Sequence, residues 1–191
     1  MLKRCLVASV LLLAAAGAAS ASTVLGLSIE DQVRLSDLVV LGEVVSLEGV
    51  VHPEQGIETA VTLKVSEALK GAARPGDLVV FHTRSGQVGD EISEAVGEAV
   101  FRVGQKTLVL VESIDGRLYN LGLSMGVWDV LESRGGRLSV ARALQDGLNV
   151  VGDAAVEMGP LPLRDLARRV TFALDHTEFD EPMLRDARVG R

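Results

Sequence analysis

The chain has 191 residues, with 19 basic and 26 acidic side chains, a formal net charge of −7, a single cysteine and 3% aromatic residues. This length is enough for one ordinary domain and too short for two large ones. One cysteine excludes a disulfide scaffold. The acidic balance and the shortage of aromatic side chains exclude a basic, aromatic-lined channel, so nucleic acid is excluded as a partner.

Residues 1–21 have the pattern of a secretory signal peptide. Two basic residues precede an uncharged run over residues 6–19, and the small residues 19–21 (Ala-Ser-Ala) supply the recognition site of a signal peptidase. This pattern predicts cleavage before Ser22 and a secreted or periplasmic protein.

A retained membrane anchor is the alternative interpretation of this run. As a helix the run covers about 21 Å, at about 1.5 Å per residue, whereas the hydrocarbon core is about 30 Å thick. Cys5 precedes the run, so it cannot be the lipidated cysteine of a bacterial lipoprotein. We therefore expect no stable membrane anchor after signal cleavage, and a mature chain without cysteine.

Residues 38–151 predict short antiparallel strands, because apolar or alternating runs recur between turn signals. Residues 61–66 alternate fully, as in a strand with one apolar and one wet face. Residues 38–45 and 107–111 are continuous apolar runs, which are typical of strands covered on both faces. Further strands are expected at residues 78–81, 117–121, 127–131 and 137–141. Strands this short and numerous predict a closed or nearly closed barrel.

Two helices are expected beside the strands. Ser28 can cap a short helix from Ile29 to about Ser36, with Asp31 three residues after the cap. Residues 163–174 place their apolar side chains on one helical face, so this amphipathic helix is expected to cap one side of the barrel. Residues 175–191 are charged and lose periodicity, which predicts a disordered tail. The predicted organisation is a signal peptide, one β-barrel domain at residues 22–174, and the tail.

A resemblance to a known family rests on two segments. Residues 36–44 (SDLVVLGEV) and 62–71 (TLKVSEALKG) resemble the opening strands of the netrin-like module, in which a short helix leads into D-x-V-V-x-G-x-V and a second strand ends in L-K-G. That module includes the tissue inhibitors of metalloproteinases. The chain is also similar to uncharacterised secreted bacterial proteins with a later Gly-rich loop like residues 85–89. The resemblance covers roughly residues 24–111 and implies an OB-like five-stranded barrel, in agreement with the strand pattern.

The resemblance also suggests where a partner would bind. The inhibitors begin with cysteines, whereas this chain has Ser22, Thr23 and Val24 after the predicted cleavage, so the motif carries over the fold and not the inhibition. If the new α-amino group chelated the zinc of a secreted metalloprotease, as it does in the inhibitors, these three residues would make the contact. The alternative is that they only lead into the first helix. Gly86 and Gly89 of the Gly-rich loop are the other predicted partner-binding residues.

Residues 122–126 (GLSMG) match the nucleophile-elbow pattern around Ser124. That pattern requires a strand, a sharp turn and then a helix, but the following residues 127–131 predict another strand. The only downstream histidine is His176, in the predicted tail. We therefore expect a glycine-flanked bend and not a catalytic serine.

No metal or cofactor site is predicted. His52, His82 and His176 are not spaced as metal ligands on a helix. Four acidic residues at positions 90, 91, 94 and 98 lack the loop pattern of a calcium site, so they predict a solvated acidic loop. Glycines at positions 86, 89, 97 and 104 lack the Gly-Lys pair of a phosphate loop and are expected to supply positive φ at bulges or corners. Residues 96–103 are expected to form a loop across the barrel mouth.

These observations favour an exported, non-catalytic β-barrel that binds another exported protein through its rim loops, with protease inhibition as a special case. Two alternatives remain. One is an exported hydrolase that uses Ser124, and the other is a structural accessory subunit of an envelope assembly.

Overall fold

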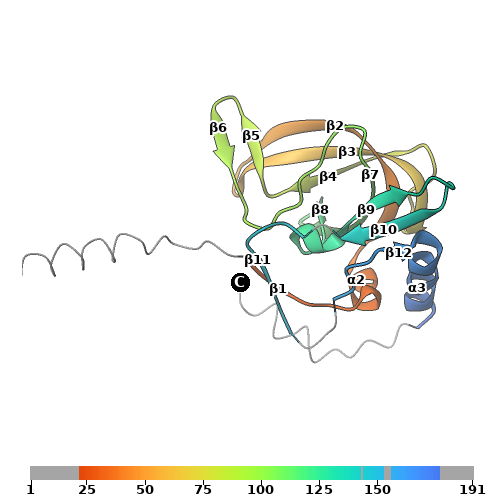
Figure 1. Cartoon of the computed structure of the whole chain (residues 1–191). Helices are drawn as coiled ribbons and strands as arrows, with labels where there is room; N and C mark the ends of the chain where they lie inside the picture. The colour runs from red at the N-terminus through yellow and green to blue at the C-terminus, as the bar shows by residue number, and fades with distance from the viewer. Residues whose placement is uncertain (1–21, 143, 153–155, 177–191) are drawn as a thin grey trace, which may run out of the picture.

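The computed structural model describes residues 22–142, 144–152 and 156–176 (Figure 1). The fold is mainly β, with a large mixed sheet, a short N-terminal helix and a C-terminal helix, as the sequence predicted in outline. The predicted signal peptide lies outside the described residues, and so does the predicted tail from residue 177 onward. The structure places Asp175 at the end of the C-terminal helix and His176 at its C-cap, so the expectation of a tail from residue 175 is wrong for these two residues.

The sheet is organised by a long antiparallel hairpin of β2 (Leu38–His52) and β3 (Gly56–Lys70). Both strands continue well beyond the predicted segments, and the turn closes at Gly56 with a φ of 87°. Three irregularities in the register bend the hairpin. At one of them a Cβ atom on Gly42 would collide with the carbonyl of Lys64, so only glycine permits this approach.

β7 (Lys106–Ile114) is the branch point of the sheet. One edge pairs with β2, and the other pairs first with β9 (Val127–Glu132) and then with β8 (Arg117–Asn120). β4 (Leu78–Thr83) pairs with β3 and meets β8 in a parallel bridge between His82 and Tyr119. The pairing therefore runs β7–β2–β3–β4–β8 and returns to β7. The parallel bridge makes the sheet mixed, which corrects the expectation of purely antiparallel strands.

The remaining strands extend the sheet or stand beside it. β10 (Leu138–Arg142) pairs with β9, and β12 (Leu161–Pro162) pairs with β10. β5 (Gly86–Val88) and β6 (Glu91–Ser93) form a separate hairpin, and β1 (Ser22–Leu25) pairs in parallel with β11 (Leu148–Val151). The sequence predicted none of β1, β5, β6, β11 and β12.

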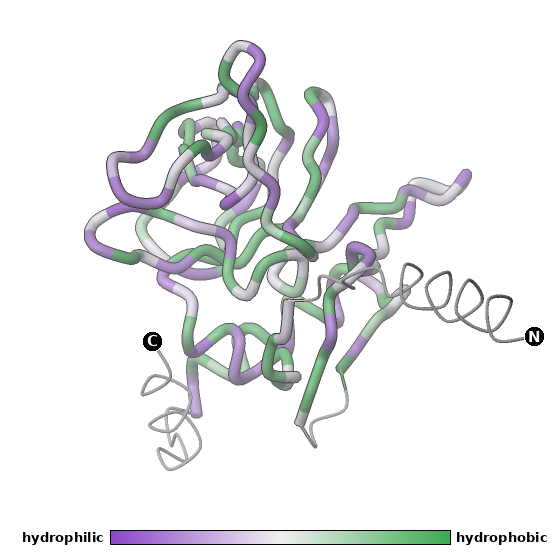
Figure 2. Tube along the Cα trace, turned by 90° about the vertical axis from the view of Figure 1, so that its left-hand side faces the viewer, coloured by the Kyte–Doolittle hydropathy of each residue, from purple (hydrophilic) through white to green (hydrophobic). Residues whose placement is uncertain are grey.

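Two apolar clusters lie on opposite faces of β2 and β7. Val40, Val44 and Val109 belong to the first cluster, together with side chains of β3 and β4. Val39 and Leu108 belong to the second cluster, which the two helices cover. This explains the continuous apolar runs in the sequence, because both faces of these strands are buried. Figure 2 shows hydrophobic stretches along the strands and hydrophilic residues at several outer turns.

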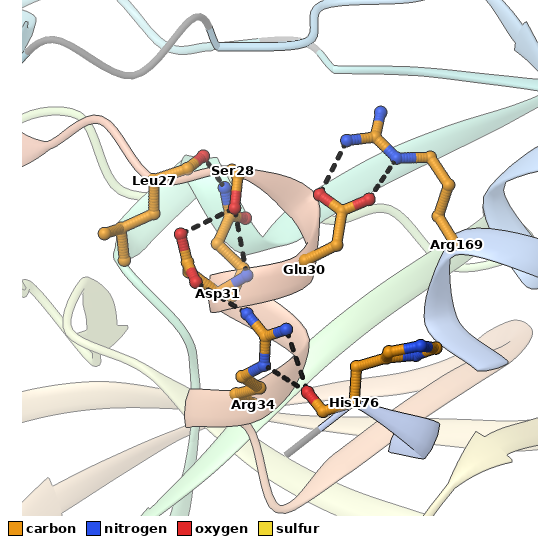
Figure 3. Close-up of polar contacts among 8 residues, drawn as sticks. Leu27, Ser28, Glu30, Asp31, Arg34, Arg169 and His176 are labelled. Carbon is orange, nitrogen blue, oxygen red and sulfur yellow. Dashed lines mark hydrogen bonds and ion pairs between the residues drawn. The ribbon is translucent and has the colours of Figure 1, made fainter. Parts of the chain in front are cut away.

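The helices α2 (Ile29–Leu35) and α3 (Leu163–Asp175) pack side by side against the second cluster. The Ser28 side chain accepts a hydrogen bond from the amide of Asp31 at 3.1 Å, as the capping pattern predicted. Glu30 of α2 accepts two hydrogen bonds from Arg169 of α3, at 2.6 and 2.7 Å (Figure 3). This bidentate pair fixes the two helices relative to each other.

The Glu30–Arg169 pair makes stability depend on pH. Hydrogen bonding to Arg169 is the largest effect on the pKa of Glu30 and lowers it from 4.5. The pair therefore stabilises the fold above pH 4.5, and this contribution is lost as the pH falls through the lowered pKa. Because both side chains are partly exposed, Glu30→Gln should reduce the free energy of unfolding at pH 7 by only about 1 kcal/mol.

Urea unfolding of the wild type and the variant at pH 7 and pH 3 tests this dependence. The difference between the two proteins should shrink at pH 3. Asp165→Asn is the control, because Asp165 makes only exposed pairs on α3. A Glu30→Gln difference that is equal at both pH values would contradict the assignment.

Candidate functional site

Residues 84–105 form a rim segment that leaves β4, builds the β5–β6 hairpin and returns to β7. The hairpin projects beyond the end of β2 and β3 (Figure 1). It crosses them at two glycines: a Cβ atom on Gly49 would collide with the carbonyl of Gln87, and one on Gly86 would collide with the backbone of Glu58. Gly86 is thus required for close approach and has no positive φ, which corrects the expectation for this position. Positions 89, 97 and 104 do have positive φ.

Glu58 is a buried carboxylate beneath this crossing, with 1% of its surface exposed. It accepts a hydrogen bond from the Tyr119 hydroxyl at 2.7 Å. Its other oxygen lies 2.9 Å from Nη2 of Arg117, in an ion pair that lacks hydrogen-bond geometry. Burial, and then the hydrogen bond to Glu58, raise the pKa of Tyr119 to about 12. The buried negative charge is therefore compensated from β8.

Glu98 is a second buried carboxylate, inside the rim segment itself, with 4% exposed. It accepts hydrogen bonds from the amide of Arg84 at 2.9 Å, the amide of Ala99 at 2.8 Å and the side chain of Asn120 at 2.7 Å. These contacts join the beginning of the segment, its return and the end of β8. The expectation of a solvated loop is wrong for Glu98, although Asp90, Glu91 and Glu94 are exposed.

Further polar contacts hold the base of the β5–β6 hairpin. The hydroxyls of Thr59 and Thr83 both donate to the carbonyl of Ser85, at 2.8 and 2.9 Å. The Ser85 hydroxyl accepts from the amide of Ala95 at 2.9 Å. The Arg84 guanidinium lies 4.9 Å from the centre of the Tyr119 ring, so the base is linked to the Glu58 site as well.

The return of the rim segment covers the first apolar cluster. Ala99 and Phe101 are buried in that cluster, and the Phe101 ring meets Phe81 edge to face at 5.3 Å. The segment contains no strand between β6 and β7, as expected for a loop in this position. Its backbone is thus anchored by apolar contacts on one side and by Glu98 on the other.

Apolar side chains nevertheless remain exposed around this segment. Ile92 is 64% exposed, Val100 59% and Val103 64%. Leu47 of β2 is 37% exposed and lines a groove of about 280 Å³ with Ile92 and Val100. We call the three groove-lining residues Leu47, Ile92 and Val100 the apolar rim.

The residues predicted to bind a partner fall into two groups, one within the rim segment and one in β1. Gly86 begins β5 and Gly89 lies in the hairpin turn. Ser22, Thr23 and Val24 lie in β1, whose partner β11 meets Gly97 of the rim segment through Leu148. The backbone nitrogen of Ser22 donates to the carbonyl of Gly147 at 3.0 Å. A neutral α-amino group at this position could keep the bond through an N–H while its lone pair binds a metal.

Ser124 supports the rim segment and is 1% exposed. It lies in the short 3₁₀ helix η1 (Leu123–Gly126), directly before β9. Its amide donates to the carbonyl of Gly97 at 3.1 Å, and its hydroxyl accepts from the amide of Gln145 at 3.2 Å. The strand that follows Ser124 is the one predicted, where a nucleophile elbow would require a helix.

The three histidines make different contacts in different parts of the structure. His52 Nδ1 accepts hydrogen bonds from the backbone amides of Glu54 and Gln55 in the β2–β3 turn, and His176 is the C-cap residue of α3. His82 contacts the carbonyl of Leu118 at 3.2 Å, and burial lowers its pKa. Within residues 22–142, 144–152 and 156–176, no three histidine, aspartate or glutamate side chains gather as metal ligands.

Comparison of the chain with protein-family models and with curated proteins gave no match. Among the helices that the structure describes, none is long and apolar enough to cross a membrane.

Sequence reasoning missed Glu58, Tyr119 and Arg117. On β3, Val61 and Leu63 point into the first cluster, whereas alternation places Glu58 on the opposite face, where a charge is ordinarily exposed. The Glu58 carboxylate is paired by Tyr119 and Arg117 of β8. Only knowledge of this long-range contact would have revealed the buried carboxylate.

Tyr119 is the only tyrosine of the chain, so its ionisation can be followed by ultraviolet absorbance. We expect the phenol to titrate near 12 and not near 10 while the chain is folded. Since folding raises this pKa, the contribution of Tyr119 to stability is present below pH 10 and is lost as the pH rises toward 12. Glu58→Gln should lower the pKa of Tyr119, because it removes the negative charge beside the phenolate.

Far-UV circular dichroism at each pH identifies the range in which the chain is folded. Glu54→Gln, in the exposed β2–β3 turn, is the control and should leave the titration unchanged. Titration of the folded wild type near pH 10 would show that Tyr119 is not held against Glu58.

Proposed function

We propose that this chain is an exported, non-catalytic binding module, built on an OB-like β-barrel, that binds another exported protein through the apolar rim. The observation that carries the proposal is the combination of exposed apolar side chains with a rigidly held backbone. Glu98 and the threonine contacts fix the segment that carries Ile92 and Val100, so these side chains are presented in a defined arrangement. Such preorganisation reduces the entropy cost of binding.

The OB-like barrel is supported by the strand pairing. The five strands β2, β3, β4, β8 and β7 pair in succession, and β7 pairs again with β2. Their inner side chains form the first apolar cluster, and the rim segment covers one end of it. This arrangement agrees with the resemblance to the netrin-like module.

The chemistry of the rim indicates the kind of partner. Exposed apolar side chains that gather around one groove are typical of protein-binding surfaces, whereas isolated ones are common on any surface. The neighbouring Asp90, Glu91 and Glu94 are exposed and acidic. A partner with an apolar patch bordered by basic residues is complementary to this surface. A secreted metalloprotease is one such candidate, with Ser22, Thr23 and Val24 adding contacts from β1.

The non-catalytic interpretation is supported by the burial of Ser124 and by its hydrogen bonds within the protein. A serine nucleophile must reach its substrate and pair with a base. Here the Ser124 hydroxyl instead accepts a hydrogen bond from the backbone amide of Gln145.

Ile92→Asp tests the binding surface. The variant should retain less than about a tenth of the partner captured by the wild type from the secreted or periplasmic fraction, because it places a charge in the apolar contact. Leu78→Asp is the matched control, since Leu78 is 63% exposed on β4 and lies outside the rim. Both variants should melt like the wild type. Equal capture by Ile92→Asp and Leu78→Asp would refute binding through the rim.

Export predicts that the protein purified from its native host begins at Ser22. Intact mass spectrometry checks this directly, and N-terminal sequencing gives the first residue. A protein that retains residues 1–21 would contradict signal cleavage and the secreted or periplasmic localisation.

A further inference from the structure

A second groove is lined by residues at the ends of β3 and β10 and in the first half of α3, none of which belongs to the apolar rim. Its volume is about 1090 Å³. The apolar lining includes Leu69, Leu138, Leu161 and Leu163, and three of these four pack against the edge of the second apolar cluster without being fully buried. The 37% exposure of Leu138 adds to the apolar surface that the fold leaves uncovered here.

Basic side chains border this apolar surface. Three basic residues, Arg137, Arg164 and Arg168, and one acidic residue, Glu67, line the groove, and the side chains of Arg164 and Arg168 are 79% and 80% exposed. Asp165 is shared between Arg164 at 3.6 Å and Arg168 at 3.5 Å, and Arg137 has no ion pair among the described residues. With three basic residues against one acidic residue, the lining of the groove has an excess of positive charge, whereas the chain as a whole has a net charge of −7.

The spacing of the arginines favours an extended ligand. Arg164 and Arg168 are four residues apart on α3, which separates them by about 6 Å along the helix axis. Alternate residues of an extended chain are about 6.6 Å apart. Two acidic side chains at positions i and i+2 of an extended segment would therefore meet both arginines, while the residue between them points to the other side.

We propose that this groove binds an extended segment of another protein in which acidic and apolar side chains alternate. The acidic side chains pair with Arg164 and Arg168, and the apolar ones cover Leu138 and Leu161. The groove borders both a helix and strands, with residues of α3, β10 and β12 in its lining, and such a site suits a peptide better than an enclosed small molecule. None of its lining residues belongs to the apolar rim, so the two sites are independent.

Fluorescence anisotropy with labelled peptides tests the proposal. The probes are Glu-Leu-Glu-Leu-Glu, the regrouped control Glu-Glu-Glu-Leu-Leu, and the basic control Lys-Leu-Lys-Leu-Lys. The alternating acidic peptide should bind at least about tenfold more tightly than either control, and its affinity should fall with salt. An acidic protein without such a site would prefer the basic peptide instead.

Charge reversal locates the binding. The double variant Arg164→Glu/Arg168→Glu should lose at least about tenfold in affinity for Glu-Leu-Glu-Leu-Glu. Arg74→Glu/Arg102→Glu makes the same change in net charge at exposed positions outside the groove. Its affinity for the peptide should stay within about twofold of the wild type. Ile92→Asp should bind the peptide normally, which separates this site from the proposed rim function.

Several results would overturn the proposal: no binding of the acidic peptide, equal or tighter binding of the basic or regrouped peptide, or equal losses in the two double variants. Circular dichroism confirms that α3 is intact in each variant, as expected for residues whose side chains are about four-fifths exposed.

Discussion

The burial of two carboxylates, Glu58 and Glu98, is the constraint on which the candidate site depends. An unpaired buried charge costs several kcal/mol, so each carboxylate needs hydrogen-bond donors or an opposite charge. Glu98 accepts hydrogen bonds from two backbone amides and Asn120, and Glu58 accepts one from Tyr119 and forms an ion pair with Arg117. Since these partners come from different parts of the chain, compensating the charges fixes those parts relative to one another.

The two carboxylates act on a segment that could not be held by regular pairing alone. Between β6 and β7 the chain has no ladder, and β5 and β6 pair only with each other. Glu98 closes this segment on itself, and the Glu58 site lies beneath the crossing that Gly49 and Gly86 permit. The apolar contacts of Phe101 complete the anchor. The backbone that carries the exposed side chains of Ile92 and Val100 is therefore fixed by buried polar and apolar contacts. This fixed backbone is the physical basis of the proposed binding surface.

The elements that could be predicted from the sequence are those that local patterns determine. The apolar runs of β2 and β7, the alternation in β3, the cap at Ser28 and the amphipathic face of α3 each give a signal within a few residues. The elements that were missed depend on distant partners. β1 forms a strand by pairing with β11, more than a hundred residues away, and the Glu58 carboxylate is paired by Tyr119 and Arg117 of the distant strand β8. The sequence groups Glu98 with acidic residues at positions 90, 91 and 94, and this pattern predicts a solvated loop. The prediction holds for those three positions and fails for Glu98, whose partners are distant in the sequence.

Hydrogen exchange of the backbone amides tests most directly whether the buried carboxylates hold the rim segment. In the wild type, the amides of Arg84 and Ala99 should exchange slowly, because both donate to Glu98. In Glu98→Gln, which keeps the size and removes the charge, amides within residues 84–105 should exchange at least about tenfold faster, while those of the β2–β3 hairpin stay protected. Unchanged exchange in residues 84–105, or an equal acceleration throughout the chain, would contradict the account.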